Sequence, residues 1–98
     1  SGERVAERHL RLVAAILGRA DLSRESVFAF DRNGFTRLDP QAAELDLLVE
    51  PAPTTTLFTL VALQIEAERL LGVSVDVLTP RSLPRGSRER ILREAVPV

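Results

Sequence analysis

Cysteine, lysine, tryptophan, tyrosine and methionine are all absent from the 98 residues of this chain. Without cysteine, neither a disulfide framework nor a thiolate metal site can form. Without lysine, catalysis through a Schiff base and phosphate binding by a P-loop lysine are both excluded. All 13 basic residues are therefore arginines, which is consistent with a GC-rich bacterial genome.

Long hydrophobic runs and a strong net charge are also missing. No apolar run approaches the roughly 18 residues that span a membrane, and no signal-peptide pattern opens the chain. We therefore expect a cytoplasmic protein without membrane contact. The net charge of −1 leaves no electrostatic footprint for nucleic acid, so direct nucleic-acid binding is not expected.

What the chain does contain is the composition of a folded domain, with 45% hydrophobic and 28% charged residues. Its length suits a single domain over residues 1–98. The hydrophobic periodicity predicts helices and strands in mixed order. The predicted helices are Glu3–Ala20, Leu57–Leu71 and Ser87–Val96; the predicted strands are Ser26–Phe30, Leu45–Glu50 and Val73–Thr79; Asp31–Pro40 is expected to be mainly loop. This order predicts an α/β (α+β) fold with a small mixed sheet of three or four strands packed with helices.

Three carboxylates on two of these strands are the candidate site. In ELDLLVEP, Glu44 and Asp46 point to one face of the strand while Leu45 and Leu47 point to the other. Asp76 stands on the next predicted strand, on the face opposite its valines. Like charges on one face are unfavourable unless a cation lies between them, so the pair is either a solvated strand end or part of a metal site for a hard cation such as Mg²⁺.

The chain from about Val27 to Val98 resembles the minimal nucleotidyltransferases of the DNA polymerase beta-like superfamily, the type found beside HEPN proteins in bacteria and archaea. The resemblance rests on SVFAF, on ELDLLVEP, on the long block TLFTLVALQIEAERLLGVSVDVLTPRSL, and on the closing RERILREAVPV. It implies a nucleotidyltransferase fold, Mg²⁺ and a nucleoside triphosphate such as ATP as cofactors if the protein is active, and a HEPN-type helical protein as partner.

The resemblance also implies a role for particular residues. Glu44 and Asp46 match the family's metal-binding acid pair, with Glu44 in place of an aspartate. Asp76 matches the third acid, which completes the metal site or acts as general base. The family's phosphate-holding Gly-Ser pair falls on Asp31 and Arg32. Asp31 brings an anion and a Cβ where a phosphate must approach the backbone, although Arg32 could bind a phosphate.

Two functions from different classes follow. The first is a catalytically degenerate, antitoxin-like or structural partner of a HEPN-type protein, or a homodimer. The second is an active Mg²⁺-dependent enzyme that moves AMP from ATP to a protein hydroxyl, with Asp76 activating the nucleophile. A module that binds nucleotide without turnover lies between them.

Apolar residues outside the expected core bear on the partner. The first half of the helix that begins at Leu57 is apolar nearly all round, so we expect it either to be deeply buried or to meet a partner. The same alternatives apply to Ile91, Leu92, Val96 and Val98 at the end of the chain. Among the phenylalanines, only Phe35 is expected to be exposed. The arginines of the last segment (Arg81, Arg85, Arg88, Arg90 and Arg93) are expected on a solvated helix face.

Overall fold

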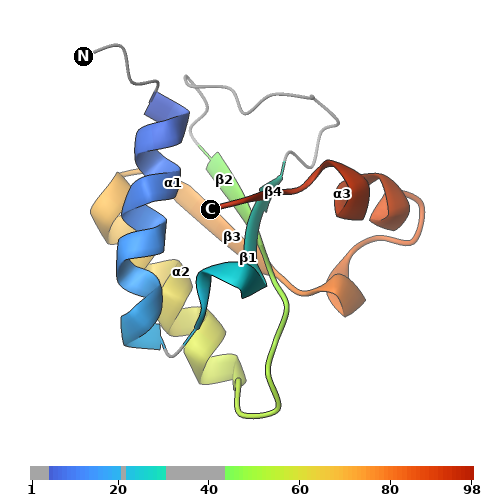
Figure 1. The fold of residues 1–98 in the computed structure, drawn as a ribbon, viewed down its shortest axis with the longest axis horizontal. Coiled ribbons are helices and arrows are strands. Elements are labelled where there is room, and N and C mark those ends of the chain that lie inside the picture. Colours follow the sequence, from blue (N-terminus) through green and yellow to red (C-terminus); the bar gives the residue numbers. More distant parts are fainter. Residues whose placement is uncertain (1–4, 21, 31–43) are drawn as a thin grey trace.

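A four-stranded mixed sheet forms the centre of the computed structural model, which describes residues 5–20, 22–30 and 44–98 (Figure 1). The strands are β1 (Val27–Phe30), β2 (Glu44–Val49), β3 (Ser74–Leu78) and β4 (Val96–Pro97), in the order β3-β2-β1-β4. β2 and β3 are parallel, whereas β1 is antiparallel to both β2 and β4. The α-helices are α1 (Val5–Ile16), α2 (Leu57–Leu71) and α3 (Arg88–Glu94), with short 3₁₀ turns at Leu17–Ala20, Arg24–Ser26 and Pro80–Ser82.

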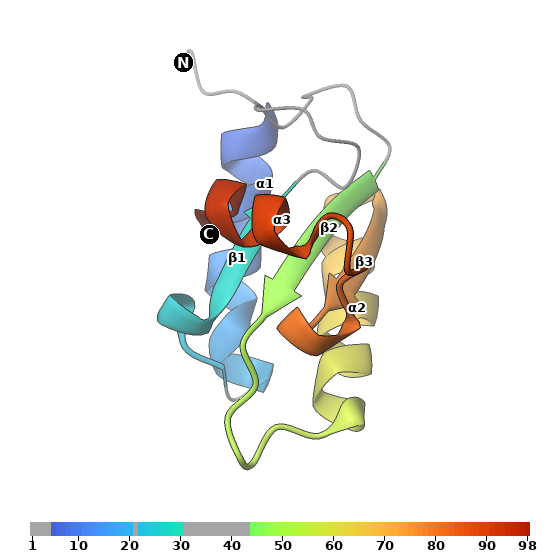
Figure 2. The ribbon, with the colours of Figure 1, turned by 90° about the vertical axis from the view of Figure 1, so that its right-hand side faces the viewer.

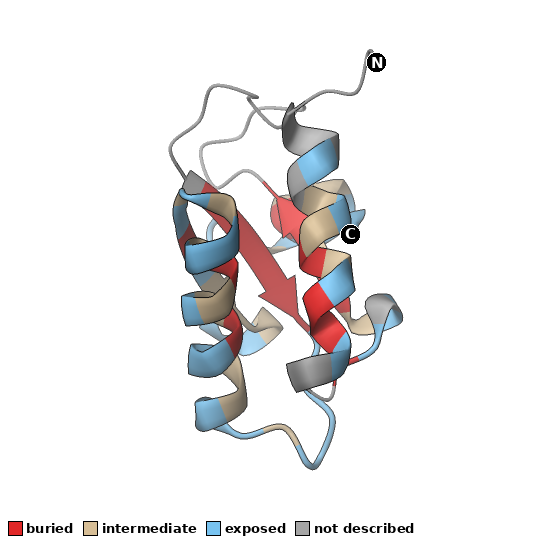
Figure 3. Cartoon of the chain, turned by 90° about the vertical axis from the view of Figure 1, so that its left-hand side faces the viewer, coloured by how far each residue is buried: buried red, intermediate tan, exposed pale blue. Residues whose placement is uncertain are grey.

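Helices α1 and α2 cover one face of the sheet, as Figure 3 shows from the helical side. In β1, β2 and β3 the residues with odd numbers point to this face, because side chains alternate along a strand. Val27, Leu47 and Val75 lie there in one buried cluster with Val13 of α1 and Leu63 of α2. This layer is the main hydrophobic core.

The opposite face is covered only in part, by α3 and the segment that precedes it (Figure 2). Phe30 and Leu48 point this way and form a second buried cluster with Leu83 and Ile91. Asp46 and Asp76 have the same parity as Leu48 and Leu78, so the acids belong to this face as well. The sheet thus separates an apolar helical layer from the side on which the carboxylates stand.

Local signals in the sequence set the limits of α2 and of the parallel crossover. Thr56 accepts a hydrogen bond from the N–H of Thr59 through its side chain and so caps the first turn. Gly72 ends the helix with a φ of 73°, a left-handed conformation that favours glycine. Helix α2 therefore begins and ends where the sequence predicts, and it supplies the long connection that two parallel strands require.

The predicted α+β architecture is confirmed, and two details of the prediction are wrong. The expected last helix, Ser87–Val96, ends at Glu94, and Val96 instead pairs with Ala29 as the start of β4. The backbone of Val96 pairs with β1, and no local sequence pattern predicts this pairing. The expected first helix also ends earlier, at Ile16, and continues as a 3₁₀ turn.

The expectation that the first half of α2 could be deeply buried is wrong. Leu57 is 74% exposed and Phe58 86% exposed, and Val61 and Ile65 are also exposed, whereas Leu63 is buried. Phe58 is thus an exposed phenylalanine, contrary to its predicted place in the core. At the end of the chain Ile91 and Val98 are buried while Leu92 and Val96 are exposed, so that set divides between the two alternatives.

In the part of the chain that the structure describes, no helix is both long and apolar enough to cross a membrane.

Candidate functional site

Asp46 and Asp76 are neighbours across the parallel pair of strands. The register of β2 and β3 makes them Cα partners, with Glu44 beside Ser74 two residues earlier. Adjacent strands lie about 4.8 Å apart, so both carboxylates leave the same face of the sheet side by side. The register thus brings together two of the three candidate acids.

The two aspartates differ in their contact with solvent. Asp46 is 8% exposed, and its Oδ1 oxygen is buried, whereas Asp76 lies on the edge strand and is exposed. A buried carboxylate beside a second one is costly unless positive charge or hydrogen bonds compensate it. The arrangement therefore gives one enclosed oxygen donor and one accessible oxygen donor next to it.

The end of β1 lies beside the same acid. Phe30, the last residue of β1, is the Cα partner of Asp46. Phe30 is the last described residue before Asp31 and Arg32, on which the sequence resemblance places the Gly-Ser pair. Asp31 and Arg32 themselves lie outside the described residues, as does the loop predicted at Asp31–Pro40.

Helix α2 fixes the edge strand on which Asp76 stands. The backbone N–H of Val75 donates a hydrogen bond of 3.0 Å to Oε2 of Glu68. Since β3 is an edge strand, alternate N–H groups along it have no neighbouring strand to bond. Glu68 satisfies one of them directly before Asp76, and it is a positioning residue that the sequence pattern did not reveal.

The donor chemistry of this pair suits a hard divalent cation. Mg²⁺ is usually held by one or two carboxylates together with water and substrate phosphates, and Asp46 and Asp76 offer that number of acids. Within residues 5–20, 22–30 and 44–98 there is no group of three or more His, Cys, Asp or Glu side chains that could enclose a metal. The structure describes the backbone of Glu44, which is the first residue of β2, but not its side chain.

The arginines of the last segment have structural partners. The guanidinium of Arg88 donates to the carbonyl oxygens of Arg81 and Leu83, at 3.2 Å each. Arg90 pairs with Glu94 at 3.1 Å on the next turn of α3. Arg88 thus ties α3 to the segment before it, and the Arg90–Glu94 pair lies within α3.

Comparisons with known proteins agree with this arrangement of strands. No family model matches the chain. A curated protein of Methanocaldococcus jannaschii, named as a putative protein adenylyltransferase, is 37% identical over 89 residues, which span 90% of this chain and 91% of that protein. A solved structure described as a putative minimal nucleotidyltransferase superposes with a TM-score of 0.72 at 30% identity, covering 100% of this chain and 99% of the other.

Glu68 can be tested through stability. We expect Glu68→Ala to lower the free energy of unfolding by about 1–3 kcal/mol, because the partly buried N–H of Val75 loses its acceptor. Glu66→Ala is the matched control, since the Glu66–Arg69 pair is 3.7 Å long and Arg69 is largely exposed, and such pairs contribute about 0–1 kcal/mol. Urea unfolding followed by circular dichroism measures both. Equal effects of the two substitutions would contradict the role given to Glu68.

Proposed function

We propose that the chain, which belongs to the minimal nucleotidyltransferase family, serves as a binding protein built on that fold. In this proposal its catalysis is largely lost. The observation that carries the proposal is the register of β1 and β2, in which Phe30, the residue before Asp31 in the sequence, is the Cα partner of Asp46. The family holds phosphates at this position with backbone N–H groups of a Gly-Ser turn. An aspartate there adds negative charge where a triphosphate would have to bind.

In this proposal the acid pair can still bind a metal ion. Asp46 and Asp76 bind a divalent cation, with Glu44 as the third ligand that the family resemblance implies. Mg²⁺ supplies positive charge that would neutralise phosphate oxygens. Asp76 is exposed, so it is also accessible to accept a proton from an incoming hydroxyl.

A second candidate function is active transfer of AMP from ATP to a protein hydroxyl. The name of the Methanocaldococcus relative, at 37% identity, favours it. In this case Arg32 would have to bind the phosphates that the Gly-Ser turn holds elsewhere in the family. Glu44 is one methylene longer than the usual aspartate and would have to reposition the metal.

Calorimetry with ATP and Mg²⁺ separates the two functions. We expect no measurable ATP binding to the chain as it stands, because Asp31 repels the phosphates. We expect binding to appear in an Asp31→Gly/Arg32→Ser variant that restores the family's turn, and to disappear again when Asp46→Ala is added. Micromolar binding to the unaltered chain that is lost in Asp46→Ala would overturn the proposal in favour of the enzyme.

The proposed binding role uses the exposed apolar stripe of α2. We define this stripe by Leu57, Phe58, Val61 and Ile65, which recur along one side of the helix, opposite the buried Leu63 and Ala67. A contiguous apolar surface of this kind usually marks a protein–protein contact. A hollow of about 400 Å³ between α1 and α2 extends the available surface and is lined by Leu12, Ala15, Ile16, Glu66, Arg69 and Leu70.

The occupant of the stripe is, in this proposal, a helical protein of the HEPN type in a cytoplasmic, antitoxin-like complex. Apolar helix faces pack well on one another, and a helix fits the hollow between two others. In the absence of that partner a second copy of the chain can cover the stripe. The interaction would then be isologous, with α2 against α2.

The stripe can be tested on the isolated chain. We expect it to form dimers in a concentration-dependent way, and Phe58→Asp/Ile65→Asp to make it monomeric, because both charges would be buried in the contact. Unfolding should change little, since both side chains are exposed. Light scattering coupled to size exclusion measures the mass, with Leu92→Asp on the opposite face as control. A wild-type chain that stays monomeric at its highest soluble concentration, or dimers that survive the double substitution, would contradict this use of the stripe.

A further inference from the structure

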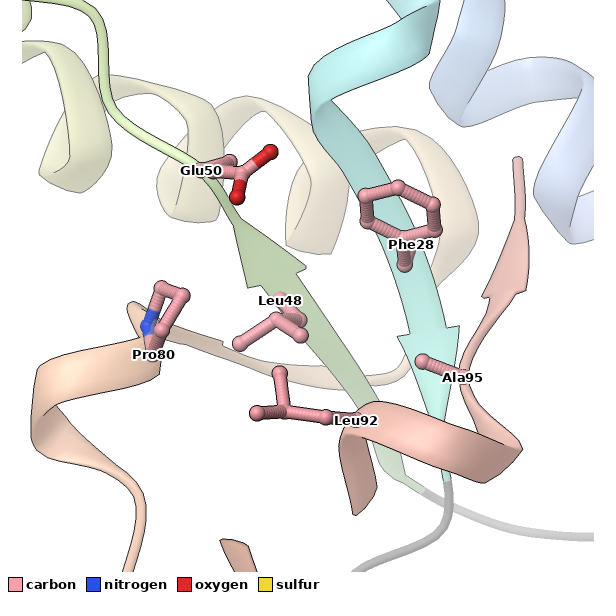
Figure 4. Close-up of a pocket in the computed structure, with 6 residues that line it drawn as sticks. All are labelled: Phe28, Leu48, Glu50, Pro80, Leu92 and Ala95. Atoms are coloured by element: carbon pink, nitrogen blue, oxygen red, sulfur yellow. The ribbon is translucent and has the colours of Figure 1, made fainter. Parts of the chain in front are cut away.

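A small cavity opens on the same sheet face as the acids, between α3 and the 3₁₀ turn Pro80–Ser82 (Figure 4). Its volume is about 210 Å³, and it is lined by Phe28, Leu48, Glu50, Pro80, Leu92 and Ala95. In Figure 4 the other five residues surround Leu48, which forms the floor. The cavity is smaller than the roughly 300–1,000 Å³ of sites for drug-sized ligands, so it suits one side chain better than a nucleotide.

The walls of the cavity are apolar except at one point. Leu92, on α3, is 49% exposed although it faces Leu48, so part of its apolar surface is available to an occupant. Glu50 follows the last residue of β2 and brings a carboxylate to the rim. Glu50 forms no ion pair with a described residue.

The position of the cavity relative to the acids follows from the strand. Asp46, Leu48 and Glu50 alternate onto the same face, and each step of two residues covers about 6.6 Å. A polypeptide with one side chain in the cavity could therefore reach Asp46 with a residue that is only a few positions away in its own sequence.

We propose that this cavity recognises one apolar side chain of a bound polypeptide that carries a positive charge beside that side chain. The apolar walls accept the side chain, and the Glu50 carboxylate attracts the neighbouring cation. The choice of a polypeptide rests on the proposed function, in which the chain binds a protein. The pocket lies on the sheet face opposite α2, so the residues of the apolar stripe do not line it.

Amide chemical shifts of the ¹⁵N-labelled full chain test the proposal in titrations with acetyl-Leu-Arg-amide, acetyl-Leu-Ala-amide and acetyl-Leu-Glu-amide. We expect shifts at Phe28, Leu48, Glu50, Leu92 and Ala95. Affinity should be roughly two- to fivefold higher for the arginine peptide than for the alanine peptide, as for an exposed ion pair. The glutamate peptide should bind weakest. Glu50→Gln should remove the preference among the three peptides.

The apolar part of the site has a matched pair of variants. Leu92→Ala should weaken all three peptides by roughly three- to tenfold, through lost apolar contact. Leu57→Ala, an equally conservative change on the stripe of α2, should leave every affinity unchanged. The proposal is overturned by equal affinities for the three peptides, by absent shifts or shifts that map to α2, or by a Leu92→Ala variant that binds like the wild type.

The titration contains neither metal nor nucleotide, so its result is separable from the proposed function. ATP binding by the unaltered chain would overturn the proposed loss of catalysis and leave the pocket in place. A pocket that fails its own titration would leave the calorimetric test of the acids unaffected.

Discussion

The parallel pairing of β2 with β3 is the constraint on which the site depends. Parallel neighbours need a long crossover, and α2 provides it between the end of β2 and the start of β3. The hydrophobic pattern then sets the register, since a slip of one residue would move Val75 out of the core and Asp76 into it. With Val75 buried against the helices, Asp76 must stand beside Asp46 on the opposite face. The acid pair is therefore a consequence of core packing on the other side of the sheet.

Much of this could be predicted from the sequence because the signals are local. Alternation in ELDLLVEP and VSVDVLT fixes which side chains share a face, and Thr56 and Gly72 mark the ends of α2. β4 could not be predicted, since Val96 is a strand residue only through its pairing with Ala29. The contact of Glu68 with the backbone of Val75 depends likewise on how α2 lies against the sheet edge. For the site, the sequence named Asp46 and Asp76 as candidates, and the register makes them neighbours; the roles of these two acids and of Asp31, Arg32 and Glu44 stay predictions.

Deep burial, one of the two alternatives for the first half of α2, is wrong for a physical reason. Leu57, Phe58 and Val61 read as core because they are large and apolar, yet a helix on one face of a small sheet can bury only one side of itself. Leu63 and Ala67 occupy that side. The remaining apolar side chains are left in solvent, which is a cost that a partner would remove. This exposed surface is the observation behind the association role proposed above.

The central claim is that Asp46 and Asp76 form one cation site although the phosphate-holding turn is altered. Manganese(II) tests it directly, because carboxylates bind Mn²⁺ as they bind Mg²⁺ and the paramagnetic ion broadens the signals of nearby amides. The account predicts that substoichiometric Mn²⁺ broadens the amides around Asp46 and Asp76 first, and that Asp46→Ala abolishes this pattern in a chain that remains folded. Broadening centred elsewhere, or a pattern unchanged in Asp46→Ala, would contradict it.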